Sequence, residues 1–354
     1  MKILIAAGIY PPDAGGPAAH AKAQFEGLPR EGIETKVVAL AHYRHWPKGL
    51  RHLLYSLALL KQALNTQAVY AHDAVGAGLP ALLAARLLGK KCLGRIGGDI
   101  AWENSGQDSG LSMSEWYAAG KQRNNMMFLL SRFFLRHADA VVVPTEQLKR
   151  LYVEVYGVKK EKIHVILNPV PSSDRAGLET ESTIIFASRL APYKNLDFAI
   201  RALEPIFQKH PNLKFIIMGD GPEKMKLKEV VENLKLSKNV IFTGPSSQEE
   251  VLMQTARCLF VLAPALTEFN PNYVLQGIAY EKPFLISREH GLPFTVLPEL
   301  TFNPRDKEEL AQKVERLLLP GAYEDAKRFV ASLDLKMSWE DNIKVNAALI
   351  RSIL

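Results

Sequence analysis

The chain has 354 residues and a formal net charge of +7, with 47% hydrophobic and 23% charged residues. This balance excludes an intrinsically disordered chain, and the length exceeds what one ordinary core holds, so we expect two domains. Its two cysteines, Cys92 and Cys258, lie in or beside apolar strand-like runs and have no metal-ligand spacing, which predicts buried thiols in a reducing compartment.

The first predicted series of elements alternates short apolar runs with amphipathic helices, for example at 50–65, 79–88, 126–137 and 146–156. Such alternation is typical of a parallel sheet with helices on both faces. The six predicted strands are Lys2–Ile9, Thr35–Leu40, Ala68–Ala71, Lys91–Ile96, Ala140–Val143 and Lys162–Ile166.

A second series begins after the Pro- and Ser-rich stretch Asn168–Asp174, which we interpret as a linker. Its predicted strands are Thr183–Ala187, Leu213–Met218, Asn239–Phe242, Leu259–Leu262 and Pro283–Ile286. The fold class predicted is α/β, with two Rossmann-like doubly wound domains facing across a cleft. We expect an acceptor-binding domain over 1–170, a nucleotide-sugar-binding domain over 171–335, and a closing helix over 336–354 that packs back on the first domain.

That closing helix has Ser338 as its predicted N-cap. Asp341 stands where a capping box usually has Glu or Gln, so we expect an imperfect box.

Charge is unevenly distributed between the two predicted domains. Residues 1–171 hold 21 Lys and Arg against 13 Asp and Glu, a net +8, whereas residues 172–354 hold 23 against 24. The first-half cations are scattered among amphipathic helices, which predicts no nucleic-acid partner. A solvated basic face, attraction to an anionic membrane and a phosphate-bearing acceptor remain as alternatives.

No signal peptide is apparent, because the apolar run Ile3–Tyr10 ends at two prolines. The uncharged stretch 74–85 is shorter than the roughly 20 residues that span a bilayer. We expect a cytoplasmic protein, with peripheral contact at the inner face of the membrane as a further hypothesis. The cationic and aromatic segment His42–His52 suits a membrane interface, and a flexible acceptor loop is the alternative.

Three segments carry the candidate chemistry of a donor site. The first, Pro11–Ala18 (PPDAGGPA), joins a strand to a helix. Gly15 and Gly16 let backbone N–H groups approach an anion there, although any α/β protein needs such a turn.

The second segment is Phe186–Leu196 (FASRLAPYKNL), in which Arg189 ends a buried strand and Lys194 precedes a helix. Two cations at the mouth of one sheet suit a diphosphate, whereas each alone would be a solvated loop charge.

The third segment is Pro264–Ala279 (PALTEFNPNYVLQGIA). Glu268 lies in a loop where its carboxylate could bind sugar hydroxyls, and Gln276 lies on the next helix, where its amide could bind a ribose. Taken singly, a surface Glu and a helix-face Gln would be the default. We also assign Asn270, Asn272 and Tyr273 to this donor site.

Shorter motifs lie between these segments: Val141–Thr145 (VVVPT), His164–Pro169 (HVILNP), Met218–Pro222 (MGDGP) and Phe242–Gly244 (FTG). With the three longer segments they occur in an order that resembles glycosyltransferase family 4, the retaining group 1 glycosyltransferases of GT-B fold. The resemblance extends along nearly the full chain.

The resemblance implies roles for the donor-side residues. Arg189 and Lys194 match the pair that holds the donor diphosphate, and Glu268 matches a Glu that contacts the transferred sugar. The chain departs from the family at Gln276, where a second Glu usually holds the ribose, and in lacking the usual Gly after Glu268. Asn195 replaces another usual Gly and tolerates the left-handed conformation.

Acceptor-side chemistry is expected in the first domain. Family relatives often place a His near Gly94–Glu103 (GRIGGDIAWE), where this chain has Asp99. Asp99 is the candidate for orienting or deprotonating the acceptor hydroxyl, with an N-cap or turn role as the alternative. His72 and Trp102 complete the acceptor-side candidates.

The implied activity is transfer of a sugar, with retained anomeric configuration, from a nucleotide diphosphate sugar to a hydroxyl acceptor. The acceptor could be lipid-linked, and the product would enter glycan, polysaccharide or glycolipid synthesis. No Asp-x-Asp pair occurs in the chain, so we expect no essential metal and no other cofactor. The alternatives are a degenerate nucleotide-sugar-binding protein and a GT-B-type sugar epimerase.

Overall fold

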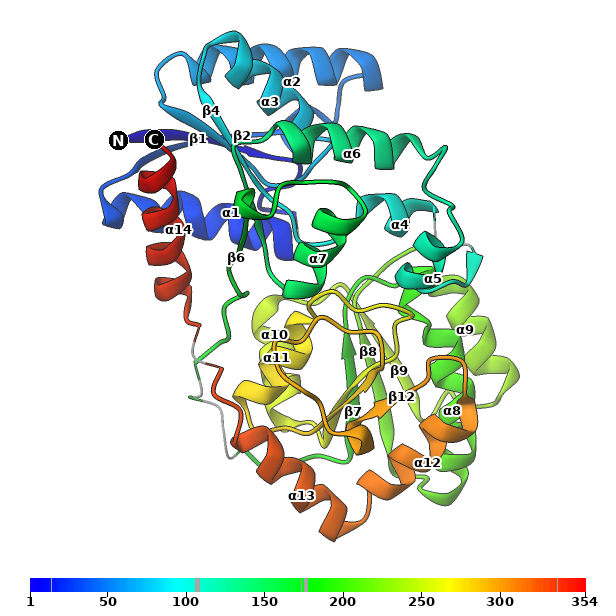
Figure 1. Cartoon of the computed structure of the whole chain (residues 1–354). Helices are drawn as coiled ribbons and strands as arrows, with labels where there is room; N and C mark the ends of the chain where they lie inside the picture. Colours follow the sequence, from blue (N-terminus) through cyan, green and yellow to red (C-terminus); the bar gives the residue numbers. More distant parts are fainter. Residues whose placement is uncertain (14, 106–108, 173, 175–177, 336) are drawn as a thin grey trace. The chain divides into compact units, whose positions relative to one another are not determined.

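A computed structural model describes residues 1–13, 15–105, 109–172, 174, 178–335 and 337–354. Within these ranges the chain forms two compact units (Figure 1). The first comprises Met1–Asn104, Tyr117–Pro169 and Met337–Leu354, and the second comprises Ser105–Trp116 and Val170–Lys336. The closing helix therefore belongs to the first unit, and one segment of the expected first domain, Ser105–Trp116, groups with the second.

The first unit is built on a six-stranded parallel sheet in the order β2-β1-β3-β4-β5-β6. Its central strands are apolar and buried, as expected for a sheet covered on both faces. The strands are β1 (Lys2–Ala7), β2 (Glu34–Ala39), β3 (Ala68–Ala71), β4 (Lys91–Arg95), β5 (Ala140–Val143) and β6 (Ile163–Val165).

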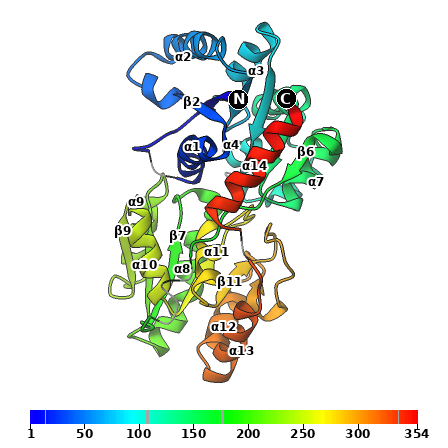
Figure 2. The ribbon, with the colours of Figure 1, turned by 90° about the vertical axis from the view of Figure 1, so that its left-hand side faces the viewer.

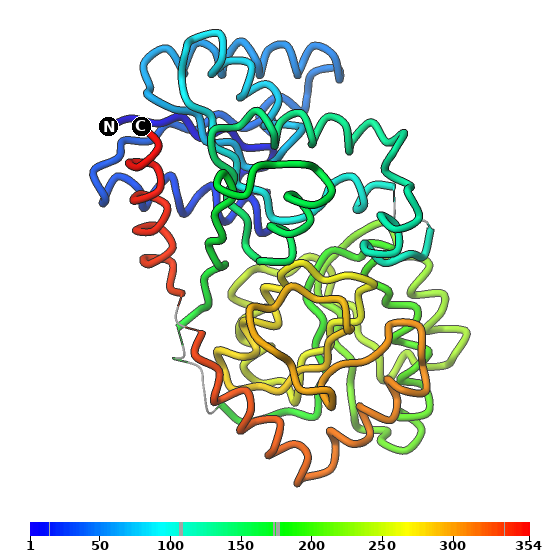
Figure 3. Tube along the Cα trace, in the orientation of Figure 1, coloured from blue at the N-terminus to red at the C-terminus, as the bar shows by residue number. Residues whose placement is uncertain are grey.

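Two groups of helices pack in this unit. Helix α3 contacts both α2 and α6, while α14 contacts α1 and shares its apolar core (Figures 2 and 3). The helices are α1 (Gly16–Gly27), α2 (Lys48–Ala63), α3 (Gly78–Leu87), α4 (Ile100–Ser105), α5 (Met113–Ala118), α6 (Met126–His137), α7 (Glu146–Glu154) and α14 (Trp339–Ile353), with α5 shared between the two units.

The second unit has its own six-stranded parallel sheet in the order β12-β11-β10-β7-β8-β9. Its strands are β7 (Thr183–Ala187), β8 (Lys214–Met218), β9 (Val240–Gly244), β10 (Phe260–Ala263), β11 (Phe284–Ser287) and β12 (Thr301–Phe302). Its helices are α8 (Leu196–Lys209), α9 (Lys224–Asn233), α10 (Gln248–Arg257), α11 (Asn272–Ala279), α12 (Lys307–Leu317) and α13 (Pro320–Ala331). The two doubly wound sheets confirm the predicted fold class.

Helix capping explains the residues found at the start of two helices, α7 and α14. In the VVVPT motif β5 ends and Thr145 accepts a hydrogen bond from Leu148 N, so this threonine is the N-cap of α7. Ser338 and Asp341 form a complete capping box at the start of α14, because the shorter Asp side chain still reaches the Ser338 N–H. The expectation of an imperfect box was therefore wrong.

The strand β12 and the helices α12 and α13 were not predicted. β12 has two residues, too few for an alternating pattern, and α12 has a strongly polar sequence. Among the described residues, no helix is both long enough and apolar enough to cross a bilayer.

Candidate functional site

The order of the strands fixes where a ligand can bind each unit. In the first unit the strand order reverses between β1 and β3, and in the second it reverses between β7 and β10. At such a switch point the two connections leave on opposite faces, which opens a crevice beyond the carboxyl ends of the strands. Arg189 follows β7 and Glu268 follows β10, so the main predicted donor residues lie at this point.

A pair of glycines supports the loop that carries Arg189. A Cβ at Gly219 would lie 2.1 Å from Ser188 O, and one at Gly221 would lie 2.3 Å from Leu190 O. The MGDGP motif is thus required for close backbone packing, which holds Arg189 at the end of β7. The Arg189 side chain is exposed and has no hydrogen-bond or ion-pair partner among the described residues.

Lys194 and Glu268 form a buried ion pair at the same edge of the sheet. Lys194 Nζ lies 2.8 Å from both Glu268 carboxylate oxygens, and the two side chains are 7% and 6% exposed. Asn195 adopts the left-handed conformation, with φ 58°, and its amide donates to Pro264 O and Pro304 O. Asn195 therefore performs the turn that a glycine would otherwise make and ties Lys194 to the sheet.

The backbone of Glu268 is fixed by a short bridge to the segment after β11. Glu268 N donates to Glu289 O, Gly291 N donates to Glu268 O, and a parallel β-bridge joins Glu268 to His290. The carboxylate therefore projects from a rigid segment into the buried pair with Lys194.

Helix α11 and the segment just before it carry three polar atoms that are unpaired among the described residues. Asn270 Nδ2, Tyr273 OH and Gln276 Oε1 are buried and have no hydrogen-bond partner among the described residues. Burial, and next the charge of Glu268, raise the pKa of Tyr273 well above its usual value, so its phenol stays protonated and can donate. Unpaired buried polar groups are costly, and a bound ligand is one way to satisfy them.

Sequence reasoning missed a second layer of contacts in the same unit. Thr267 Oγ1 donates to Glu289 Oε1 and accepts from Met113 N, while Arg305 makes a two-pronged ion pair with Glu115. The pairs are 22 to 190 residues apart, so no local pattern could indicate them. They anchor the stretch 109–116 beside the strand extension that carries Glu268.

Gly15 and Gly16 lie at the switch point of the first unit. Gly15 has φ 128°, a backbone region that favours glycine, and it is the N-cap of α1, with Pro17 in the first turn. This geometry matches the predicted strand-to-helix turn. Their role toward the donor stays a prediction.

Asp99 makes the contacts of a structural anchor. Its Oδ1 accepts from Trp102 N, and its Oδ2 accepts from the hydroxyls of Tyr117 and Tyr156, each at 2.7 Å. Asp99 is 1% exposed and Trp102 is fully buried. These contacts favour the N-cap interpretation of Asp99, and a contact of either residue with the acceptor stays a prediction.

His72 follows β3 and is 5% exposed, with Nε2 2.9 Å from Gln24 Oε1. Burial, and next the charge of Arg95, lower its pKa to about 3, so the imidazole is neutral at physiological pH. A neutral ring of such low basicity is a poor general base, so hydrogen bonding to a ligand is the better role for His72. Among the described residues, no group of three or more His, Cys, Asp or Glu side chains is arranged to hold a metal ion.

The fold and these residues define a class of protein. It is an α/β protein with two Rossmann-like sheets, and two cations lie at the switch point of the second sheet. Comparison with known families narrows it further. Residues 9–174 match the model for Glycosyltransferase Family 4, and residues 172–332 match that for Glycosyl transferases group 1. The chain therefore belongs to the group 1, family 4 glycosyltransferases, as its motifs predicted.

Two curated relatives match about half of the chain. Exopolysaccharide phosphotransferase SCO2592 of Streptomyces coelicolor is 29% identical over 57% of the chain and 23% of its own length. Alpha-monoglucosyldiacylglycerol synthase of Streptococcus pneumoniae is 27% identical over 49% of the chain and 42% of its own length. The chain thus spans less than half the length of these two curated relatives.

Solved structures extend the similarity over the whole chain. HepE of Anabaena, solved in complex with UDP-glucose, matches with a TM-score of 0.74, 16% identity and complete coverage of both chains. At this identity the likeness shows the fold, which is that of the GT-B glycosyltransferases.

The ion pair Lys194–Glu268 should dominate the stability of the donor edge. We expect Lys194→Met to lower the free energy of unfolding by about 3–5 kcal/mol, because it leaves a buried carboxylate without a partner. Urea unfolding of this variant and of the double variant Lys194→Met/Glu268→Gln measures the difference, and the double variant should recover at least about half of the loss.

The exposed pair Lys209–Glu315 is the matched control, since its side chains are 58% and 44% exposed. Lys209→Met should cost less than about 1 kcal/mol. Equal losses in Lys194→Met and Lys209→Met would show that the buried pair carries no special stability.

Asp99→Ala should act on stability rather than on turnover. Removing three hydrogen bonds to a buried carboxylate is expected to cost about 3 kcal/mol, while Tyr156→Phe, which loses one hydroxyl, should cost about 1 kcal/mol. The folded Asp99→Ala protein should turn over a nucleotide-sugar donor within about threefold of wild type. A hundredfold loss at unchanged stability would assign Asp99 to catalysis instead, since general acid–base catalysis contributes about 10²–10⁴.

Proposed function

We propose that this chain is a retaining, metal-independent glycosyltransferase that uses a nucleotide diphosphate sugar and a hydroxyl acceptor. The observation that carries the proposal is the switch point of the second unit. Among the described residues, an Arg189 without a partner, the pair Lys194–Glu268 and three unpaired buried polar atoms lie at one sheet edge there.

The two cations suit the diphosphate of the donor. The Arg189 guanidinium is exposed and unpaired in the described structure, so its forked donors are available to phosphate oxygens. The Lys194 ammonium has three N–H groups, and two account for its contacts with Glu268. The third can donate to a phosphate oxygen without breaking the ion pair.

The remaining polar groups suit the sugar and the ribose. Each Glu268 oxygen keeps a free lone pair for a sugar hydroxyl while it accepts from Lys194. Gln276 Oε1 is a buried acceptor without a partner in the described structure, which suits a ribose hydroxyl. Asn270 Nδ2 and Tyr273 OH are unpaired donors that suit the phosphate or sugar oxygens between them.

Retention is proposed to proceed by attack of the acceptor on the face from which the nucleotide diphosphate departs. This route needs no protein nucleophile; it needs stabilisation of the anionic leaving group and a positioned acceptor. Arg189 and Lys194 would stabilise the leaving group. The chain contains no Asp-x-Asp pair for a metal-bound diphosphate, which supports the proposal that no metal is essential.

Two relatives suggest which substrates to test first. HepE was solved with UDP-glucose, which supports uridine diphosphate sugars as donors. The similarity to a monoglucosyldiacylglycerol synthase supports a lipid-linked acceptor, and the proposed role is in glycan, polysaccharide or glycolipid synthesis.

Arg189→Ala should lower donor turnover at least tenfold, which corresponds to about 1.4 kcal/mol of transition-state stabilisation. The assay follows release of nucleoside diphosphate from uridine, guanosine and adenosine diphosphosugars, with and without EDTA, and NMR gives the anomeric configuration of the product. Wild-type turnover should be unchanged by EDTA, and the product should retain the donor's configuration.

Arg201→Ala is the control, because this exposed arginine on α8 only pairs with Asp197 one turn away. It should keep full turnover. If Arg189→Ala also keeps full turnover, the diphosphate assignment fails. Donor binding by the wild type without any turnover would identify the chain as a nucleotide-sugar-binding protein instead.

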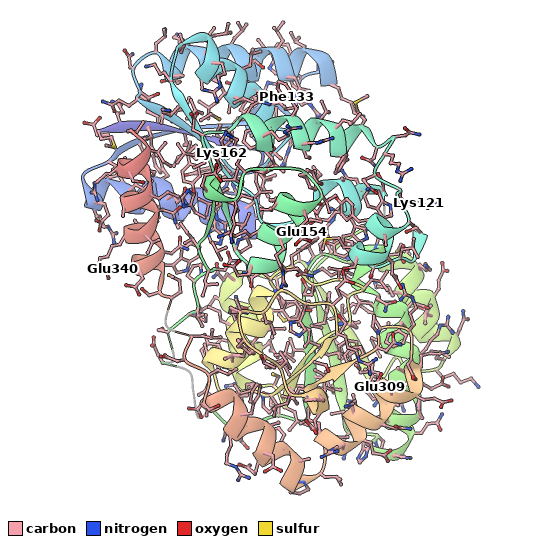
Figure 4. The ribbon with its side chains drawn as sticks, in the orientation of Figure 1. Lys121, Phe133, Glu154, Lys162, Glu309 and Glu340 are labelled. Carbon is pink, nitrogen blue, oxygen red and sulfur yellow. The ribbon has the colours of Figure 1, made fainter. Side chains whose placement is uncertain are left out.

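A second part of the proposal concerns a face of the first unit formed by α2, α3 and α6. Each helix exposes a stripe of large apolar residues at helical spacing, and Figure 4 labels one of them, Phe133 on α6. Such a contiguous exposed patch marks an interaction surface. Its members are Leu50, Leu53, Leu57 and Leu64 on and just after α2, Leu83 and Leu87 on α3, and Met126, Leu129 and Phe133 on α6.

The charge of these three helices supports an anionic membrane as the proposed partner. They contain six Lys and Arg residues and no Asp or Glu. Apolar stripes flanked only by cations complement the inner leaflet of a membrane, where anionic lipids attract basic segments. We therefore assign this face to peripheral contact with an anionic bilayer, at the cytoplasmic side where nucleotide sugars are found.

Removing apolar side chains from this face should release the protein from membranes. Leu53 and Leu57 are 56% and 54% exposed, so Leu53→Ser/Leu57→Ser should preserve the fold. We expect at least tenfold weaker partitioning onto vesicles that contain half phosphatidylglycerol, because each buried leucine contributes about 1.5–3 kcal/mol. Vesicle co-sedimentation measures the partitioning.

Leu319→Ser is the matched control, since Leu319 is 58% exposed but lies in the second unit. It should leave partitioning unchanged. Wild-type binding should also fall on neutral phosphatidylcholine vesicles. Equal binding by the double variant, or concentration-dependent dimerisation without vesicle binding, would overturn the membrane assignment.

A further inference from the structure

The switch point of the first unit holds a buried polar cluster that the donor chemistry does not use. His20 and Gln24 come from α1, His72 follows β3, and Arg95 is the last residue of β4. All four side chains are at most 7% exposed. They lie at the edge of the sheet where ligands of doubly wound folds bind.

Arg95 is a buried cation without a counter-ion. Its guanidinium donates to Asn168 Oδ1 at 2.7 Å, and no carboxylate among the described residues pairs with it. Burial lowers the pKa of Arg95 to about 10, which leaves it charged at neutral pH. Buried charges are normally paired, because leaving one uncompensated is strongly destabilising.

Three further polar atoms around this cation have no partner among the described residues. They are His20 Nδ1, Gln24 Nε2 and His72 Nδ1, and all three are buried. His72 and Arg95 follow Ala71 and Gly94, which pair between β3 and β4, so the two residues are neighbours at the end of the sheet. After the larger effect of burial, the charge of Arg95 also lowers the pKa of both histidines. Among the described residues, three unpaired polar atoms and one cation without a carboxylate partner therefore lie in this cluster, and a bound ligand would satisfy them.

The closing helix packs beside the cluster. Tyr70 OH donates to Asn346 Oδ1 on α14, Asn346 Nδ2 donates to Asn342 O, and Asn342 Nδ2 donates to Leu167 O. The ring of Trp339 lies 4.8 Å from that of His20. The ring of Tyr70 also lies 5.3 Å from that of His72, so a hydrogen-bonded network lies beside the cluster, which favours a preorganised site.

We propose that Arg95, His20, Gln24 and His72 bind an anionic group of the acceptor, a phosphate or a carboxylate with a neighbouring hydroxyl. The inference rests on the proposed function and names the chemical class of its acceptor.

The hydrogen-bond donors and acceptors of the cluster support this class of ligand. Arg95 and the Gln24 amide supply N–H donors, which suit an oxyanion and repel a cation. When His72 Nε2–H donates to Gln24 Oε1, its Nδ1 is left as an acceptor, which suits a hydroxyl. An acidic sugar, a sugar phosphate and a phospholipid headgroup all combine an oxyanion with a hydroxyl.

Isothermal titration with inorganic phosphate tests the site in the full-length protein. Phosphate can also bind at the donor edge, so the titration compares wild type, Arg95→Gln and Arg189→Gln. We expect Arg95→Gln to weaken one phosphate site at least tenfold and Arg189→Gln to leave that site intact. Acetate in place of phosphate tests a carboxylate, and hexose 6-phosphate against a short-chain alkyl phosphate separates a soluble from a lipid source.

Arg95→Lys is the control for a folding defect, because lysine keeps the positive charge but lacks the forked N–H donors of the guanidinium. It should bind phosphate between wild type and Arg95→Gln. Phosphate binding that is lost in Arg189→Gln and kept in Arg95→Gln would overturn the site, as would no binding of phosphate or acetate by wild type. Arg95-dependent binding in a protein that turns over no donor would retain the site and contradict the proposed function, so the two can fail separately.

Discussion

The strand order of the two parallel sheets is the constraint on which the rest of the structure depends. Where the order reverses, neighbouring connections leave on opposite faces, and the carboxyl ends of two strands stay uncovered. In the second unit this places the loops after β7 and β10 together, and in the first it places the loops after β1 and β3 together. The polar groups discussed above are brought together by these two reversals, although they lie far apart in the sequence.

The buried cations at the two switch points have different partners. In the second unit the charge of Lys194 is balanced by Glu268, so the ligand-free site is electrically neutral apart from the exposed Arg189. In the first unit Arg95 has an amide oxygen as its partner, and the nearby histidines stay neutral. A charge that is compensated within the protein favours stability, whereas one that is left uncompensated favours binding of the opposite charge.

The sequence predicted the parts of the site that belong to one strand–loop–helix unit. Arg189 and Lys194 follow β7 within a few residues, so a buried strand and the next helix locate them. The sequence could not predict that Asp99 pairs with Tyr156, because 57 residues separate them. It also could not show that Arg95 is buried without a carboxylate, since that depends on every chain segment around it. The sequence also could not predict the hydrogen bond from Met113 N to Thr267 Oγ1, because 154 residues separate the two.

The departure from the family at position 276 also has a physical reason in this structure. Gln276 Oε1 is buried and unpaired among the described residues, and the one buried cation of the donor edge, Lys194, already pairs with Glu268. A glutamate at this position would place a second carboxylate at the edge, where Lys194 already pairs with Glu268 and Arg189 is exposed to solvent. The neutral amide lowers the cost of buried charge while its carbonyl oxygen can still accept from a ribose hydroxyl. Under the proposed function, Gln276 would give up some strength of ribose binding in exchange for a smaller cost of buried charge, which is compatible with an active enzyme.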